Sequence, residues 1–354
     1  MDTVADSAHI DVTRQREVVA ALAAFLPPHA LLYEREDVQP YECDGLSAYR
    51  RLPMVVAIPQ TEDEVRRILQ TCRGLNVPVV ARGAGTGLSG GALPPGDGVL
   101  LSLARFMRIL DIDPAARTAR VEPGVRNLAI SEDAAPYGLY YAPDPSSQIA
   151  CSIGGNVAEN SGGMHCLKYG LTVHNILKLR VVTIEGELLD IGSDGLDNAG
   201  YDLLALITGS EGLLAVITEI TVKLLPKPDR AQCILAAFDD VGKAGQAVAN
   251  IIAAGIIPAG LEMMDKITTG AVEPFVNAGY PLNAAAILLC ESDGNEAEVA
   301  EEIERMKAVM HSSGATEVRV SASEAERLRF WAGRKAAFPA AGRVSPDYYC
   351  MDGT

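Results

Sequence analysis

The first hundred residues alternate between apolar and polar positions at spacings that predict a helix, a strand, a second helix and a second strand. Residues 14–26 have the apolar spacing of a short helix, and the apolar run at 54–58 predicts a strand. The sequence TEDE at 61–64 is a capping box, which opens a helix that runs to about Cys72. A strand over 79–81 completes this β-α-β unit and carries the chain into a glycine-rich loop.

Strands predominate in the region that follows, where apolar runs are short and separated by turn residues. The exception is 137–170, which predicts a nearly continuous loop, and a loop of that length inside a domain is usually functional. The other predicted elements are strands at 99–103, 108–112, 117–122 and 215–225, a helix at 125–135, and a hairpin over 177–191 that turns at Glu185-Gly186.

The second half of the chain has a different pattern, which begins after the sequence Pro226-Lys227-Pro228, a predicted linker. The predicted order beyond it is β-α-β-β-α-β, the ferredoxin-like arrangement, followed by a last helix at 325–338. The six elements are a strand at 233–238, a helix at 242–254, strands at 257–263 and 285–291, a helix at 296–312 and a strand at 316–320.

The glycine-rich loop is the first feature that indicates chemistry. Residues 82–91 read RGAGTGLSGG, and glycine lets backbone N–H groups approach a ligand closely, as phosphate cradles require. The helical continuation of a Rossmann fingerprint is missing, because further glycines and prolines follow. The loop therefore predicts a phosphate cradle of another kind, with a flexible surface loop as the alternative.

Composition limits the classes of partner. The 354 residues carry a formal net charge of −16, which argues against nucleic acid and anionic membrane surfaces. Seven scattered cysteines without a C-x-x-C pair predict no metal site, no iron–sulfur cluster and no disulfide framework. The N-terminus lacks the regions of a signal peptide, and the most apolar stretch, 251–261, is too short to span a bilayer. These features predict a cytoplasmic protein without a transmembrane segment.

Two further segments join the glycine loop: PDPSSQIACSIGGNVAENSGG at 143–163 and TGSEGLLAVITE at 208–219. The three together resemble the FAD-binding domain of the vanillyl-alcohol oxidase/p-cresol methylhydroxylase superfamily. Within it they resemble the FAD-linked oxidase branch, which holds D-lactate dehydrogenases, D-2-hydroxyglutarate dehydrogenases and the flavin subunit of bacterial glycolate oxidase. The loops and the stretch 330–354 look most like this last member.

The resemblance implies an α+β fold with a two-subdomain FAD-binding domain of the p-cresol methylhydroxylase (PCMH) type. That domain is expected over 50–228, after an N-terminal helical segment at 1–49. A ferredoxin-like α/β cap or substrate domain, incomplete at its C-terminus, is expected over 229–354.

The same resemblance nominates the residues that contact FAD. The glycine loop is expected to bind the pyrophosphate, the stretch 143–162 the flavin ring and ribityl chain, and 211–217 the adenine end and ring edge. Arg82 is a candidate counter-charge, with a structural carboxylate as its alternative partner. The loop contains no histidine or cysteine, so the FAD is expected to be non-covalent. The nominated residues are Arg82, Gly83, Ala84, Gly85, Thr86, Gly87, Leu88, Ser89, Gly90, Pro143, Asp144, Ser147, Gly154, Gly155, Asn156, Asn160, Ser161, Gly162, Glu211, Gly212 and Ile217.

Arg334 and His165 each have two alternative interpretations, and Glu159 has one. Relatives place an arginine at the position of Arg334, in a Trp-x-x-Arg helix, to bind the substrate carboxylate, and a guanidinium suits that task. A solvated helix arginine beside Lys335 is the alternative. His165 is expected either to face the flavin or to make a structural hydrogen bond. Glu159 is expected to be a solvated surface carboxylate.

The expected function is FAD-dependent oxidation of a small 2-hydroxy acid, glycolate first, by hydride transfer to flavin N5. Partner subunits, including an iron–sulfur protein, are expected to accept the electrons, with peripheral attachment to the inner membrane through them as one alternative location. The rival hypotheses are a non-catalytic flavin-binding or electron-transfer subunit and a D-lactate or D-2-hydroxyglutarate dehydrogenase.

The resemblance also implies a missing C-terminal segment. Family members carry the signature His-x-Gly-Asp-Gly-x-x-His and a later Glu-His-Gly, which hold a divalent metal near the substrate hydroxyl. Neither occurs here, and the sequence stops at 352–354 within an expected strand. A metal is therefore expected only with that segment, and a chain truncated there is expected to turn over substrate weakly.

Overall fold

The structure, a computed structural model, describes residues 10–193, 200–345 and 349–351. The chain divides into two compact units. The first consists of residues 1–162, 171–225 and 349–354, and the second of residues 163–170 and 226–348. The change of unit at 225–226 falls close to the boundary expected at 228. The strand expected at 352–354 lies outside the described residues.

The first unit begins with a four-stranded sheet in the order β1-β2-β4-β3, in which β2, β4 and β3 are parallel. The predicted β-α-β unit is confirmed: Thr61 and Glu64 form the capping box that opens the helix between β2 and β3. The elements of this half are α1 (Val12–Ala23), β1 (Leu31–Leu32), α2 (Arg35–Val38), β2 (Val55–Ala57), α3 (Glu62–Gly74), β3 (Val79–Arg82) and β4 (Val99–Ser102).

A five-stranded antiparallel sheet forms the rest of the first unit, in the order β5-β6-β10-β8-β9. The predicted hairpin is confirmed, because β8 pairs with β9 and the Gly186 N–H closes the turn onto the Thr183 carbonyl. The strands are β5 (Ile109–Asp113), β6 (Thr118–Val121), β8 (Ile176–Val182), β9 (Leu188–Gly192) and β10 (Val216–Lys223). The helices are α4 (Asn127–Ala134) and α7 (Leu203–Ile207), and β7 (Leu139–Tyr140) pairs with β11 (Leu225–Pro226).

The sequence pattern predicted that the segment 137–170 is nearly all loop, and this prediction is wrong. The segment contains α5 (Ile153–Glu159) and α6 (Cys166–Tyr169). The helix α5 has two glycines in its first turn, Gly154 and Gly155, which have low helix propensity, and its Ile153 and Val157 are fully buried in the core of the first unit. Tertiary packing therefore forms this helix where the local sequence does not favour one.

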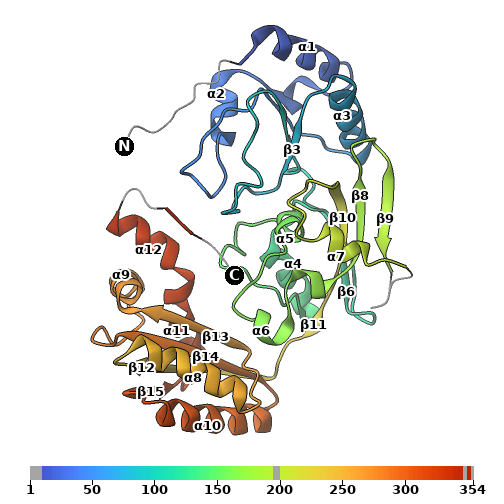
Figure 1. Cartoon of the computed structure of the whole chain (residues 1–354). Helices are drawn as coiled ribbons and strands as arrows, with labels where there is room; N and C mark the ends of the chain where they lie inside the picture. Colours follow the sequence, from blue (N-terminus) through green and yellow to red (C-terminus); the bar gives the residue numbers. More distant parts are fainter. Residues whose placement is uncertain (1–9, 194–199, 346–348, 352–354) are drawn as a thin grey trace. The chain divides into compact units, whose positions relative to one another are not determined.

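The second unit is built on a four-stranded antiparallel sheet in the order β13-β14-β12-β15, the strand order of a ferredoxin-like fold (Figure 1). Its elements are β12 (Arg230–Phe238), α8 (Val241–Ala253), β13 (Gly260–Asp265), α9 (Lys266–Val276), β14 (Ala286–Gly294), α10 (Glu296–Ser312), β15 (Glu317–Val320), α11 (Glu324–Lys335) and α12 (Ala337–Val344).

Helices cover both faces of this sheet. One core packs α8 and α10 against it, with Phe238 and Met306 fully buried. The other core packs α9, α11 and α12 against the opposite face and includes Met164, from the short excursion 163–170. The sequence missed α9 between β13 and β14, and it predicted one last helix where the chain forms two, α11 and α12.

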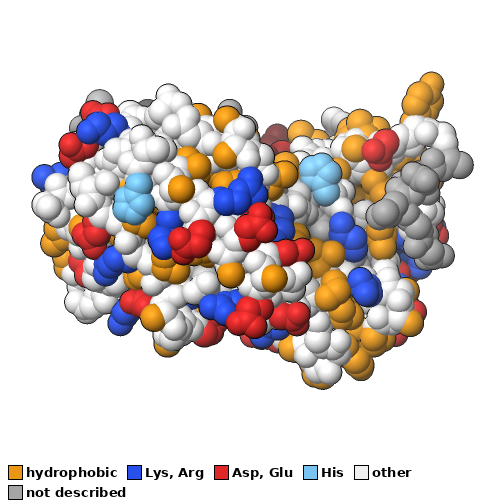
Figure 2. Space-filling model, turned by 90° about the horizontal axis from the view of Figure 1, so that it is seen from below, with side chains coloured by type: hydrophobic (Ala, Val, Ile, Leu, Met, Phe, Trp, Pro, Cys, Tyr) orange, Lys and Arg blue, Asp and Glu red, His pale blue; other side chains and the backbone are white. Residues whose placement is uncertain are grey.

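Acidic and basic side chains are interspersed over the face of the molecule that Figure 2 presents. Among the described residues, ion pairs such as Arg230–Glu296, with a 2.8 Å contact, also join acidic and basic side chains. The formal charge of −16 is therefore not gathered into a single acidic patch on that face.

Candidate functional site

The glycine loop leaves β3 with its backbone donors unused. Among the described residues, no group accepts a hydrogen bond from the N–H groups between Gly83 and Gly91. Gly85 and Gly90 have φ of 68° and 82°, a conformation that L side chains rarely adopt. Since partly buried N–H groups normally find acceptors, the loop fits an anionic ligand that lies against it.

The other two segments of the resemblance, 143–163 and 208–219, contain buried hydroxyls without a hydrogen-bond partner among the described residues. A Cβ on Gly83 would stand 2.2 Å from Oγ of Ser152, a buried hydroxyl without a hydrogen-bond partner among the described residues. Thr208 and Ser210 also carry buried oxygens that no described residue satisfies. An unsatisfied buried polar atom costs about 1–3 kcal/mol, so these groups fit a ligand that supplies hydrogen bonds.

Arg82 supports the loop from its own side. Its Nη1 donates to the Cys43 carbonyl at 2.7 Å, and its guanidinium lies 5.8 Å from the centroid of the Tyr41 ring. A Cβ on Gly85 would come within 2.3 Å of Nη2. Burial lowers the pKa of Arg82, although the Asp44 carboxylate opposes that effect. The partner seen here is thus a backbone carbonyl, and a role as pyrophosphate counter-charge stays a prediction.

The carboxylates of Glu159 and Glu211 lie against the glycine loop. A Cβ on Gly87 would lie 2.2 Å from Oε1 of Glu159, and one on Gly91 would lie 2.1 Å from Oε2 of Glu211. Glu211 has a left-handed backbone, with φ of 56°. Burial, together with the charge of Glu211, raises the pKa of Glu159 to about 7. The expectation of a solvated surface carboxylate at Glu159 is therefore wrong.

The predicted amide Asn156 is used inside the protein. It is buried, its Nδ2 donates to Ser161 Oγ at 3.3 Å, and its Oδ1 accepts from Asn127 Nδ2 at 2.9 Å. Asn127 also donates to the Pro143 carbonyl at 3.0 Å, so it links Pro143 to Asn156. Sequence analysis missed Asn127, which lies outside the three motifs.

The other nominated residues divide by environment. Ile217 lies in the hydrophobic core of the first unit, and Gly154 packs so closely that a Cβ would come 2.5 Å from Pro123. Asn160 ends α5 in a left-handed conformation and accepts a hydrogen bond from the Val173 N–H at 3.0 Å. Partly exposed positions are Gly83, Gly85, Thr86, Gly87, Leu88, Gly90, Ser147, Gly155, Ser161, Gly162, Glu211 and Gly212; Ala84 and Ser89 are exposed, and Asp144 is buried.

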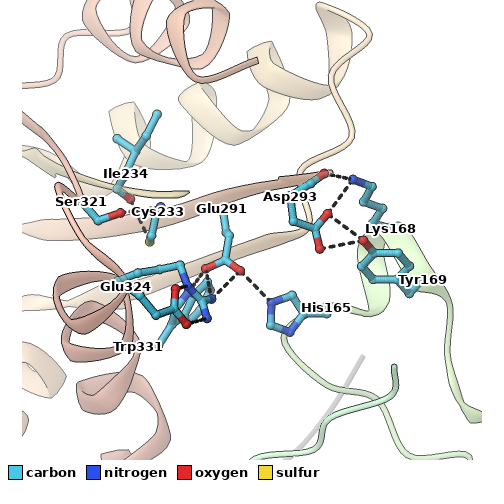
Figure 3. Close-up of polar contacts among 11 residues, drawn as sticks. His165, Lys168, Tyr169, Cys233, Ile234, Glu291, Asp293, Ser321, Glu324 and Trp331 are labelled. Atoms are coloured by element: carbon cyan, nitrogen blue, oxygen red, sulfur yellow. Dashed lines mark hydrogen bonds and ion pairs between the residues drawn. The ribbon is translucent and has the colours of Figure 1, made fainter. Parts of the chain in front are cut away.

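A buried carboxylate organises the second unit (Figure 3). Glu291, on β14, is fully enclosed and accepts hydrogen bonds from Arg327 Nη1 at 2.8 and 2.9 Å and from the Trp331 indole. His165 Nε2 lies 3.2 Å from Oε1 of the same carboxylate. Burial raises the pKa of Glu291, but hydrogen bonding to His165 and the charge of Arg327 outweigh it, so the pKa falls below its ordinary value.

A second carboxylate on β14 holds the same excursion of the chain. Lys168 Nζ lies 2.6 Å from Oδ1 of Asp293, and the Tyr169 hydroxyl donates to this carboxylate at 2.6–2.7 Å (Figure 3). The segment 163–170 is therefore fixed to the ferredoxin-like sheet at two acidic side chains. This places His165 in a structural contact, and its alternative role facing the flavin remains untested.

Arg334 lies in the last turn of α11, and it is partly exposed. Its Nε donates to Oε2 of Glu262, on β13, at 2.9 Å. The helix turn is held by Tyr280, whose hydroxyl donates to the Phe330 carbonyl, and a Cβ on Gly333 would overlap that hydroxyl at 2.2 Å. The guanidinium is thus carried on a firmly packed helix end.

Sequence analysis missed the partners of Arg334 and His165. Glu291 was detectable as a charged residue inside the apolar run AAAILLCESDG. The spacing of Arg327, Trp331 and Arg334, at i, i+4 and i+7, also indicated one helix face. Neither signal identified which carboxylate each side chain would meet.

Neither a metal-ion cluster nor a membrane-spanning helix is found in the parts of the chain that the structure describes. These residues contain no group of three or more His, Cys, Asp or Glu side chains arranged to hold a metal ion. No helix among them combines the length and apolarity needed to cross a bilayer.

Two family models match the chain in the order of its two units. The FAD binding domain matches residues 53–192, and the C-terminal domain of FAD linked oxidases matches residues 227–354. The first match contains the loop with unused N–H groups, and the second contains Glu262, Glu291 and Arg334. The chain belongs to the FAD-linked oxidases.

Individual relatives define the branch. The chain is 63% identical over 349 residues to glycolate oxidase subunit GlcD of Escherichia coli K12, covering 99% of this chain and 70% of that protein. It is 39% identical to glycolate oxidase subunit GlcD of Bacillus subtilis 168, covering 89% of this chain and 67% of the relative. Among solved structures, p-cresol methylhydroxylase with bound substrate superposes with a TM-score of 0.77 at 16% identity, over 92% of this chain and 70% of that one. The predicted fold class and family are confirmed.

Proposed function

We propose that this chain oxidises a small 2-hydroxy acid with bound FAD, and that glycolate is its preferred substrate. The observation that carries the proposal is the 63% identity to glycolate oxidase subunit GlcD over 99% of the chain. Fold likeness alone would not support a substrate, because one fold serves many reactions.

The residues of the first unit fit the cofactor. The free N–H groups of 83–91 would bind the pyrophosphate, and the hydroxyls of Ser152 and Ser210 would supply further donors. When bound, FAD would supply the two-electron acceptor for the hydride that leaves the α-carbon. The loop offers no histidine or cysteine for a covalent bond to the flavin.

The second unit would supply substrate recognition. Arg334 would bind the substrate carboxylate through its guanidinium, which forms two parallel hydrogen bonds with a carboxylate. Its packed position at the end of α11 would fix the acid and leave the hydroxyl-bearing carbon in one orientation. His165, held by Glu291, would contribute to the shape of the site by anchoring the segment 163–170.

Partner subunits would take the electrons onward. The name of the Escherichia coli relative describes that protein as a subunit, and an iron–sulfur protein is the partner that we propose. The sequence has seven scattered cysteines without a C-x-x-C pair, which fits a cytoplasmic location. A divalent metal near the substrate hydroxyl remains a proposal that depends on the further C-terminal segment of family members.

Anaerobic reduction of bound FAD tests the proposal directly. Glycolate should bleach the flavin absorbance faster than D-lactate or D-2-hydroxyglutarate at equal concentration. The variant Arg334→Ala should retain the flavin spectrum while its reduction by glycolate slows by at least tenfold, because a desolvated charge loses its partner. Faster reduction by D-lactate or D-2-hydroxyglutarate would reassign the substrate. An absence of reduction by all three would favour a non-catalytic flavin-binding subunit.

A further inference from the structure

Arg334 is held at one edge of its guanidinium only. The contact runs from Nε to Oε2 of Glu262 at 2.9 Å, and both side chains are partly exposed, at 29% and 24%. Within 10–193, 200–345 and 349–351, no residue accepts a hydrogen bond from Nη1 or Nη2 of Arg334. Four of its five N–H donors therefore remain available.

The backbones of β13 and α11 bring Glu262 and Arg334 together. Gly260 and Glu262 lie two residues apart on one face of β13, and they meet Trp331 and Arg334, which lie three residues apart on one face of α11. A Cβ on Gly260 would stand 2.9 Å from the Trp331 ring, so only glycine lets the helix approach the strand this closely. β13 and α11 therefore meet at two places: the close packing of Gly260 against Trp331 and the ion pair between Glu262 and Arg334.

The free edge has the geometry that a carboxylate needs. Nη1 and Nη2 present two parallel N–H bonds, which match the two oxygens of a carboxylate end-on. An unheld arginine at a helix end would populate several rotamers, and fixing them on binding would cost affinity. Holding Nε removes that freedom in advance and leaves the terminal edge open.

We propose that Glu262 is a positioning residue that holds the Nε edge of Arg334 and thereby presents its Nη1–Nη2 edge to the substrate carboxylate. This inference rests on the proposed function, in which Arg334 binds that carboxylate. The opposite arrangement, with Glu262 as a competitor that blocks the arginine, would require it to occupy the terminal nitrogens. Glu262 instead contacts Nε.

Oxalate binding to the FAD-loaded chain tests the proposal without turnover. Oxalate carries carboxylates but no α-hydrogen, so it perturbs the flavin spectrum without reducing it. Glu262→Ala should raise the Kd of oxalate about tenfold, the scale of one hydrogen bond to a charged group. Glu262→Gln should lose less than threefold, because its amide oxygen still accepts from Nε. Glu262→Asp keeps the charge but shortens the side chain by one methylene, so it should bind as weakly as Glu262→Ala.

The controls separate positioning from general damage. Glu317→Ala removes a carboxylate from β15 of the same sheet, where it pairs with Arg319, and should leave oxalate binding unchanged. The Kd of FAD and the melting temperature should be the same in the Glu262 variants and the parent. Adding Glu262→Ala to Arg334→Ala should cause no further loss, since the two residues act as a unit.

The outcomes distinguish this inference from the proposed function. If Arg334→Ala leaves oxalate binding unchanged, the carboxylate role of Arg334 is wrong. If Arg334→Ala weakens binding while Glu262→Ala and Glu262→Asp bind as tightly as the parent, only the positioning role is wrong. Tighter binding by Glu262→Ala would show Glu262 to be a competitor and would also overturn the inference.

Discussion

His165 Nε2 lies 3.2 Å from Oε1 of Glu291, although the two residues are 126 positions apart in the chain. Glu291 also accepts from Arg327 and Trp331, so one buried carboxylate receives three side chains. These donors keep the carboxylate ionised despite its burial, which would otherwise favour the neutral acid.

Removing this carboxylate should destabilise the second unit strongly. Glu291→Leu leaves Arg327 and the Trp331 indole without their buried acceptor, and breaking a buried charge pair costs about 3–5 kcal/mol. Urea unfolding followed by tryptophan fluorescence measures this effect, because Trp331 is the one tryptophan in the sequence. The exposed neighbour Glu324, which also pairs with Arg327, is the control, and Glu324→Gln should change stability by less than about 1 kcal/mol. Equal effects of the two substitutions would contradict a central role for Glu291.

The raised pKa of Glu159 predicts a fall in stability as the pH rises. Its pKa is about 7 in the folded chain against an ordinary 4.5, so the folded state binds its proton more tightly than the unfolded state does. The resulting stabilisation is complete below pH 4.5 and is lost as the pH rises through about 7. A pKa difference of this size would correspond to about 3 kcal/mol in the free energy of unfolding. Because the side chain is only half-buried, solvent screening reduces the expected loss of stability to about 1–2 kcal/mol.

Urea unfolding of the FAD-free chain between pH 5 and pH 8 measures this decrease in stability with rising pH. Glu159→Gln should flatten the profile over that window, because an amide does not titrate. The exposed Glu132 pairs with Arg126 on the surface, and Glu132→Gln should leave the profile unchanged. A parent profile that is already flat would show that Glu159 ionises as it does in the unfolded chain.

Two glycines in helices should respond in opposite directions to alanine. In α5, a Cβ at Gly154 would stand 2.5 Å from Cβ and 2.9 Å from the carbonyl oxygen of Pro123, so Gly154→Ala should cost about 1–3 kcal/mol and weaken FAD binding. In α8, a Cβ at Gly245 meets nothing within 4 Å, so Gly245→Ala should stabilise the chain by about 0.5–1 kcal/mol. Thermal unfolding and FAD titration of both variants measure the difference. Similar stability changes in the two variants would show that Pro123 moves aside to accommodate the added methyl group.

Bound FAD should leave the protein on denaturation. Because the loop 82–91 lacks a histidine or cysteine, acid or heat should release one FAD per chain into the supernatant. Absorbance of the supernatant and of the protein pellet checks this stoichiometry. Flavin that stays with the pellet would indicate a covalent bond to another residue.

The sequence predicted those elements whose signals are local. Thr61 and Glu64 form the predicted capping box because both partners lie within one helix turn. The helix α9 was missed because Gly270 and Pro274 lower its helix propensity, while its stability comes from the Asp265 cap and from the buried Val272.

The candidate site was predictable only in part. The glycine loop was visible because its composition reports backbone geometry directly. Contacts such as His165–Glu291 and Arg334–Glu262 join residues that are distant in sequence, and nothing near either partner specifies the other. The environment of Glu159 was missed for the same reason, since the charges of Glu211 and Asp44, from other segments, add to the effect of burial on its pKa.

The eight-residue excursion 163–170 means that the two units are not separable by a single cut. Proteolysis at 226–229 would yield two polypeptides, and the N-terminal one would still carry the segment 163–170, which belongs to the second unit. A recombinant fragment of residues 226–348 would lack His165, Lys168 and Tyr169, and so leave Glu291 and Asp293 with incomplete partners. Producing the ferredoxin-like unit alone therefore requires grafting the excursion back onto it as an added peptide or by circular permutation.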